Sequence, residues 1–170
     1  MYIVLLRGIN VGGHNKLPMA EFVGILTGLG ASGVKTYIQS GNAVMRGDVS
    51  AEAIAGAIEK AKGFRPKVMV LPLADFKAIA AGNPFHVARS EGKTLHIWFL
   101  AKPAEFDDSH AARLMIASEQ YHVTNHAIYL HAPDGIGRSK LAAAMEKLAN
   151  VPATARNWNT VAKLLDLAEA

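Results

Sequence analysis

The chain contains no cysteine among its 170 residues. This absence excludes disulfide bonds, thiolate metal sites and a thiol nucleophile. The sequence also has no apolar run near the roughly 20 residues that a membrane-spanning helix requires. Met1 leads directly into the apolar segment "YIVLLRG", which is typical of a buried strand and not of a signal peptide. We therefore expect a cytoplasmic protein without a membrane partner.

Negative charge is scarcer than positive charge. There are 14 acidic and 18 Lys or Arg residues, which gives a formal net charge of +4. This excess is permissive for anionic partners but too small to require nucleic acid. Apolar residues make up 51% of the chain and charged residues 19%, a composition typical of a globular protein.

The hydrophobic periodicity of the first half predicts six elements. "YIVLLRG" is an apolar strand, and Pro18 opens a helix that ends at Gly30. "VKTYIQ" and "NAVMR" form a hairpin, a helix follows Asp48 and Ser50, and "KVMVL" is another strand. The order is βαββαβ, which is typical of the ferredoxin-like unit.

The second half repeats this order. "TLHIWFL" is a strand, a helix follows Asp107, "EQYHV" and "AIYLH" form a hairpin, and a helix covers 138–150. "VPATAR" is a short strand before an amphipathic C-terminal helix. We therefore expect an α/β (α+β) fold, a tandem pair of ferredoxin-like βαββαβ units with a C-terminal helix. The halves are residues 1–71 and 94–170, joined by a short helix and a polar loop over 72–93.

Four stretches together carry a family resemblance: "LLRGINVGGHNKLPM", "TYIQSGN", "PDGIGRSKL" and "TARNWNTV". They resemble the bacterial family known as domain of unknown function 1697 over nearly the whole chain. The resemblance implies a small bacterial α/β protein of uncharacterised function, and it supplies no catalytic residue.

The common nucleotide-binding and hydrolase motifs do not fit. "RGINVGG" follows a strand, but its glycines do not have the G-x-G-x-x-G spacing of dinucleotide-binding folds. "GIGRSK" lacks the G-x-x-x-x-G-K-[ST] pattern of a P-loop. No G-x-S-x-G elbow is present, and Ser40 is better explained as part of a hairpin turn.

Metal ligands are not grouped either. His126 and His131 are separated by an odd number of residues on a predicted strand, so they face opposite sides. No His-x-x-x-His helix or acidic cluster accompanies them, and we expect no metal site. The sequence does not indicate which cofactor, if any, is used.

Cations stand at three helix starts, where the helix dipole favours acidic side chains. His14 and Lys16 precede one helix, Arg138 and Lys140 begin another, and Arg156 adjoins the last. Each exposed, unpaired cation there costs a few tenths to about 1 kcal/mol. A bound anion would convert that cost into attraction, although exposed Lys and Arg are often harmless.

Topology groups the polar residues into two clusters. In a βαββαβ unit the first βα loop and the central hairpin turn lie at the same end of the sheet, and so do the second βα loop and the end of the last strand. We expect both clusters to line one cleft between the halves, because ligand sites favour such interfaces. The predicted ligand-binding residues are Arg7, Asn10, Asn15, Lys16, Gln39, Ser40, Asn42, Arg138, Ser139, Lys140, Arg156, Asn157, Trp158 and Asn159.

The leading hypothesis is binding of a small phosphorylated or otherwise anionic ligand. Trp158 would supply a stacking face, and His14 and Asp134 are the only proton-transfer groups near these loops, so catalysis stays open. One alternative is a nucleic-acid-binding protein that reads the backbone through its basic loops, with strong salt dependence. Another is a protein-interaction or structural module. The oligomeric state is not readable from the sequence.

Overall fold

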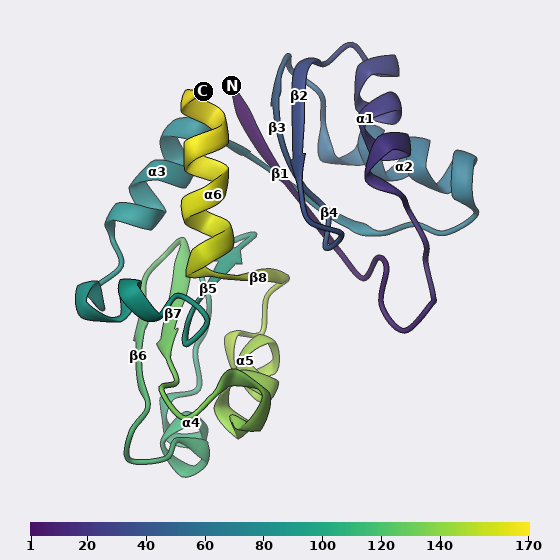
Figure 1. Ribbon diagram of the computed structural model, residues 1–170. Helices are drawn as coiled ribbons and strands as arrows, with labels where there is room; N and C mark the ends of the chain where they lie inside the picture. Colours follow the sequence, from purple (N-terminus) through teal and green to yellow (C-terminus); the bar gives the residue numbers. More distant parts are fainter. The chain divides into compact units, whose positions relative to one another are not determined.

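The computed structural model describes all 170 residues (Figure 1). In the first half, β1 (Tyr2–Arg7), α1 (Met19–Gly28), β2 (Ser32–Tyr37), β3 (Asn42–Arg46), α2 (Ala51–Lys62) and β4 (Lys67–Pro72) follow one another. The four strands form an antiparallel sheet in the order β2-β3-β1-β4. This order and connectivity are those of a ferredoxin-like unit.

The second half has the same topology. Its elements are β5 (Leu95–Leu100), α4 (Asp108–Leu114), β6 (Gln120–Val123), β7 (Ala127–His131), α5 (Lys140–Ala149) and β8 (Ala153–Asn157). The antiparallel sheet has the order β6-β7-β5-β8, which corresponds strand for strand to the first sheet. The predicted tandem pair of ferredoxin-like units is confirmed.

The remaining helices are α3 (Leu73–Ala81), the 3₁₀ helices η1 (His86–Glu91) and η2 (Ile136–Arg138), and the C-terminal α6 (Trp158–Glu169). The polar stretch after α3, expected as a loop, therefore contains η1. By backbone contacts the chain divides into a unit of Met1–Ala78 with Ala162–Ala170 and a unit of Ile79–Val161. The Lys35 Nζ atom donates to the Ala170 carbonyl at 3.1 Å, which ties the C-terminus into the first unit. No helix combines the length and apolar character needed to cross a membrane.

Each unit has its own core between the sheet and two helices. In the first unit Phe22 of α1 and Ile54 of α2 pack with Val4 and Leu6 of β1, and all four are fully buried. Figure 1 shows α1 and α2 on the same side of this sheet. In the second unit Leu141 and Met145 of α5 pack with alternate residues of β5 and β7. The strand period of two and the helix period of 3.6 place these residues on facing surfaces.

The turn between β2 and β3 depends on a glycine. Gly41 has φ +90°, and its carbonyl accepts a hydrogen bond from the Leu6 amide at 2.8 Å. A Cβ atom at this position would lie 2.6 Å from the Leu6 Cβ and 2.9 Å from the Ile9 Cδ1. Both the backbone conformation and the close approach of β1 therefore require glycine here.

We expect Gly41→Ala to lower the free energy of unfolding by about 2–4 kcal/mol, because it combines left-handed strain with overpacking. Gly33→Ala is the matched control: Gly33 also has a left-handed φ of +60°, but nothing lies within 4 Å of its added Cβ. That variant should lose only about 1–2 kcal/mol from strain. Urea denaturation measures both, and equal losses would contradict the packing argument.

His96 of β5 is a buried titratable group in the second unit. Its ring lies 6.0 Å from the Trp98 ring, and its Nδ1 atom is buried without a hydrogen-bond partner. Burial lowers the pKa of His96 from 6.5 to about 4 because the charged imidazolium loses its hydration. The folded protein therefore holds this histidine neutral.

Because the folded pKa of His96 lies below its unfolded value, the associated stability is present above pH 6.5 and is lost as the pH falls toward 4. Between pH 7.5 and pH 5 the loss should be about 2 kcal/mol. Urea denaturation of wild type and His96→Gln across this range should show the two free energies of unfolding converging by that amount. Parallel curves would mean that this histidine charges without cost.

Candidate functional site

Asn10 joins the loop after β1 to the turn between β2 and β3. Its Nδ2 atom donates to the Gln39 carbonyl at 2.8 Å and to the Leu17 carbonyl at 2.9 Å, and its Oδ1 accepts from the Leu17 amide at 2.8 Å. The predicted neighbourhood of these two segments is confirmed. The Asn10 side chain serves to hold the loop in shape.

Two further asparagines of this cluster have similar roles. The Asn15 Nδ2 atom donates to the Gly8 carbonyl at 2.9 Å. Asn42 is fully buried, and its Nδ2 atom donates to the Tyr37 carbonyl at 3.0 Å and the Ser40 Oγ at 2.9 Å. Arg7, at the end of β1, is partly buried, whereas His14, Lys16 and the Gln39 side chain are exposed. The asparagine amides thus bond to the chain itself, whereas His14, Lys16 and Gln39 extend into solvent.

In the second unit the segment "PDGIGRSKL" forms a tight turn, η2 and the start of α5. Gly135 has φ +108°, which permits the turn, and the Ser139 Oγ accepts from the Ala142 amide at 3.0 Å as the helix N-cap. Ser139 is buried, while Arg138 and Lys140 on either side of it are exposed. The local sequence thus caps the helix with serine and leaves both cations on the surface.

These cations line a pocket of about 340 Å³ that lies within the second unit. α4 and the turn after it form one wall, and the segment from Asp134 into α5 forms the other. The lining residues are Arg113, Leu114, Met115, Ile116, Glu119, Asp134, Gly135, Arg138, Ser139 and Lys140. We call this the α4–α5 pocket.

The charges in the α4–α5 pocket are not paired with one another. The side chains of Arg113, Arg138 and Lys140 form no salt bridge or hydrogen bond within the chain. The Asp134 carboxylate instead accepts from the Ser118 hydroxyl at 2.6 Å, and the buried Glu119 accepts from the Ile116 amide at 3.1 Å. Three cations thus remain available to an external anion.

The last predicted group, Arg156 to Asn159, is held by contacts within its own unit. Burial lowers the pKa of Arg156 to about 10, and its Nη1 atom donates to the Ala155 carbonyl at 2.8 Å. The Arg89 guanidinium lies 4.8 Å from the Trp158 ring centroid, which is a cation–π geometry. The Asn157 Oδ1 accepts from the Thr160 amide at 3.0 Å. The Trp158 amide donates to the Gly92 carbonyl at 3.1 Å.

The two predicted segments of the second unit share an end of the sheet but not the pocket. β7 ends at His131, opposite Leu95, and β8 ends at Asn157, opposite His96, so both strands end beside the start of β5. None of the residues 156–159 lines the α4–α5 pocket. The other wall, formed by Arg113 to Ile116 and Glu119, was not predicted from the sequence, because no motif marks the turn after α4.

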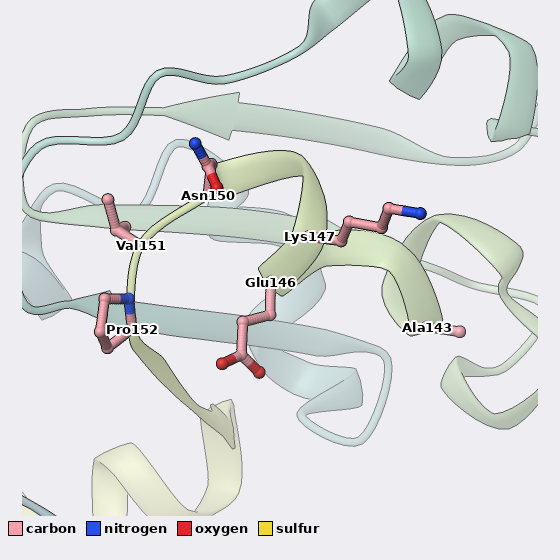
Figure 2. A pocket seen from close by; sticks show the side chains of 6 residues that line it. All are labelled: Ala143, Glu146, Lys147, Asn150, Val151 and Pro152. Carbon is pink, nitrogen blue, oxygen red and sulfur yellow. The ribbon is translucent and has the colours of Figure 1, made fainter.

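Other hollows offer fewer converging groups. One of about 530 Å³ lies at the C-terminal end of α5 (Figure 2). Figure 2 shows the side chains of Glu146, Lys147 and Asn150 leaving the helix in different directions. A third hollow of about 440 Å³ lies beside η1 and includes His131. No group of three or more His, Asp or Glu side chains is arranged to hold a metal ion.

Lys140 and Lys147 provide a test of the unfavourable charge at the start of α5. Lys140→Gln removes a cation from the positive end of the helix and should raise the free energy of unfolding by a few tenths to about 1 kcal/mol. Lys147→Gln removes one from the last turn of the same helix and should lower it by a similar amount. Urea denaturation at low salt measures both. A loss of stability in Lys140→Gln would show that this lysine has a structural role.

Comparison with known proteins places the chain among uncharacterised relatives. A solved structure of a conserved bacterial protein from Streptococcus pneumoniae is similar, with a TM-score of 0.66 and 25% identity over 99% of this chain and 98% of that one. No curated protein matches. The model of the family described as protein of unknown function DUF1697 matches residues 1–129, a span that ends before "PDGIGRSKL". The chain therefore belongs to the DUF1697 family of proteins of unknown function.

Proposed function

We propose that this protein binds a small phosphorylated or otherwise anionic ligand in the α4–α5 pocket. The observation that carries the proposal is the set of three cations, Arg113, Arg138 and Lys140, which line one pocket without an acidic partner. Guanidinium groups bind phosphate and carboxylate through paired, charge-assisted hydrogen bonds. Two arginines and one lysine on opposite walls suit a ligand held between them.

The two carboxylates of the pocket reduce its positive charge without cancelling it. Asp134 and Glu119 each accept a hydrogen bond from the chain itself, so their oxygens are partly satisfied. Three cations against two acids leave a formal excess of one positive charge. Hydrogen bonds to charged groups contribute roughly 1.5–3 kcal/mol each, so two good contacts suffice for a measurable affinity.

The proposal concerns binding and includes no reaction. Asp134 is the predicted proton-transfer group that lines this pocket, and its carboxylate accepts a hydrogen bond from the Ser118 hydroxyl. In the first unit, the exposed His14, Lys16 and Gln39 remain candidates for contacts with a ligand. Arg7 and Arg156 are partly buried and are less suited to capture from solvent.

An NMR titration with inorganic phosphate at low ionic strength tests the proposed function. The amide signals of Arg113 and of residues 135–141 should shift, and Arg138→Gln should raise the dissociation constant about tenfold, equivalent to about 1.4 kcal/mol. Lys147→Gln removes the same charge from the far end of α5 and should leave the dissociation constant within twofold. If Arg138→Gln and Lys147→Gln have equal effects, net charge and not the pocket attracts the anion.

A further inference from the structure

The end of α4 and the turn after it contribute three consecutive apolar residues to the α4–α5 pocket, which we call the apolar wall. Leu114, Met115 and Ile116 all line it. Met115 is 37% exposed and Ile116 is 51% exposed, and both are among the few large apolar side chains of the chain that face solvent. Two adjacent members of that small set therefore lie in the same pocket as the three unpaired cations.

Hydrogen bonds within the turn after α4 hold this apolar wall in place. The Met115 amide closes α4 on the Ala111 carbonyl at 2.9 Å, and Met115 itself turns to an extended conformation. The Glu119 amide donates to the Ile116 carbonyl at 3.1 Å while the Glu119 carboxylate accepts from the Ile116 amide at 3.1 Å. Glu119 is only 4% exposed, so a buried carboxylate fixes the turn that presents Ile116 to solvent.

Exposure of these side chains has a cost that a ligand would remove. Apolar surface in contact with water is unfavourable in proportion to its area, and the chain could have placed polar residues in this solvated turn. The apolar wall and the cationic groups lie in one hollow of about 340 Å³, a volume at the lower end for small-molecule sites. Such a hollow suits a small molecule with one charged end.

We propose that the ligand of the α4–α5 pocket is a small amphipathic anion. Its phosphate or other anionic group lies against Arg113, Arg138 and Lys140, and its alkyl or aromatic body covers Met115 and Ile116. This inference rests on the proposed function and narrows it, because a fully hydroxylated sugar phosphate or inorganic phosphate would leave the apolar wall in water. The chemistry predicts that affinity rises with the apolar part of the ligand.

A homologous series of phosphate monoesters tests the inference. Dissociation constants are measured by NMR titration for inorganic phosphate, methyl, butyl and hexyl phosphate, with 1-hexanol as the uncharged control. Each methylene that reaches the wall should tighten binding about two- to fourfold. Hexyl phosphate should therefore bind at least tenfold more tightly than methyl phosphate, and 1-hexanol should bind far more weakly than hexyl phosphate.

Variants distinguish the contributions of the anionic and the apolar ends of the ligand to its affinity. Met115→Gln and Ile116→Thr keep the side chains close to their original size and lie at exposed positions, so the fold should tolerate them. Each should reduce the advantage of hexyl over methyl phosphate by threefold or more, because the alkyl chain loses its apolar contact. Arg138→Gln should weaken every phosphate ester by the same factor, about tenfold.

The outcomes distinguish the inference from the proposed function. If inorganic phosphate and its esters bind at Arg138 with equal affinity, the apolar wall does not contribute to binding and this inference is wrong. The proposed function, binding of an anion in the pocket, would still be supported. If no phosphate compound shifts the pocket amides, or if 1-hexanol binds as tightly as hexyl phosphate, the proposed function itself is wrong. Shifts at Met115 and Ile116 that depend on protein concentration alone would mean that a second copy covers the wall, which would overturn the inference.

Discussion

Three positive charges share a pocket with two carboxylates that are already hydrogen-bonded within the chain, and the proposed anion binding depends on that arrangement. Arg113 comes from α4, and Arg138 and Lys140 flank the N-cap of α5. The helix dipole makes the α5 positions unfavourable for cations, and the nearby Asp134, which accepts a hydrogen bond from Ser118, forms no salt bridge with them. The pocket therefore keeps a formal excess of one positive charge.

The two units differ in how their polar loops are arranged. In the first unit the loop after β1 is shaped by asparagine amides, which Asn10 and Asn15 direct to backbone carbonyls. In the second unit a pocket lies between the turn after α4 and the loop before α5, which correspond to the α1–β2 and β3–α2 connections of the first unit. The same topology therefore supports a loop with internal side-chain hydrogen bonds in one unit and an open, charged pocket in the other.

Short-range patterns were enough to predict most elements and part of the candidate site. The apolar run "TLHIWFL" matches an observed strand, and Ser50 and Asp107 cap the helices that were predicted to follow them. Arg138 and Lys140 stood out because their position at a helix start is visible in the sequence. Arg113 and Ile116 did not stand out in the sequence. The residues that line the pocket opposite them lie about twenty residues further along the chain. The role of Trp158 was also hidden, since its partner Arg89 lies far away in the sequence.

The sequence by itself determined the order βαββαβ in each half, because periodicity and capping are local properties that neighbouring residues settle. It also determined which cations violate the helix dipole rule. Only the tertiary structure decided which of these cations share a pocket, which acids are already occupied and which apolar side chains stay exposed beside them. Those properties depend on contacts between elements distant in sequence, and the packing of α4 and its turn against the start of α5 has no signature in either segment alone.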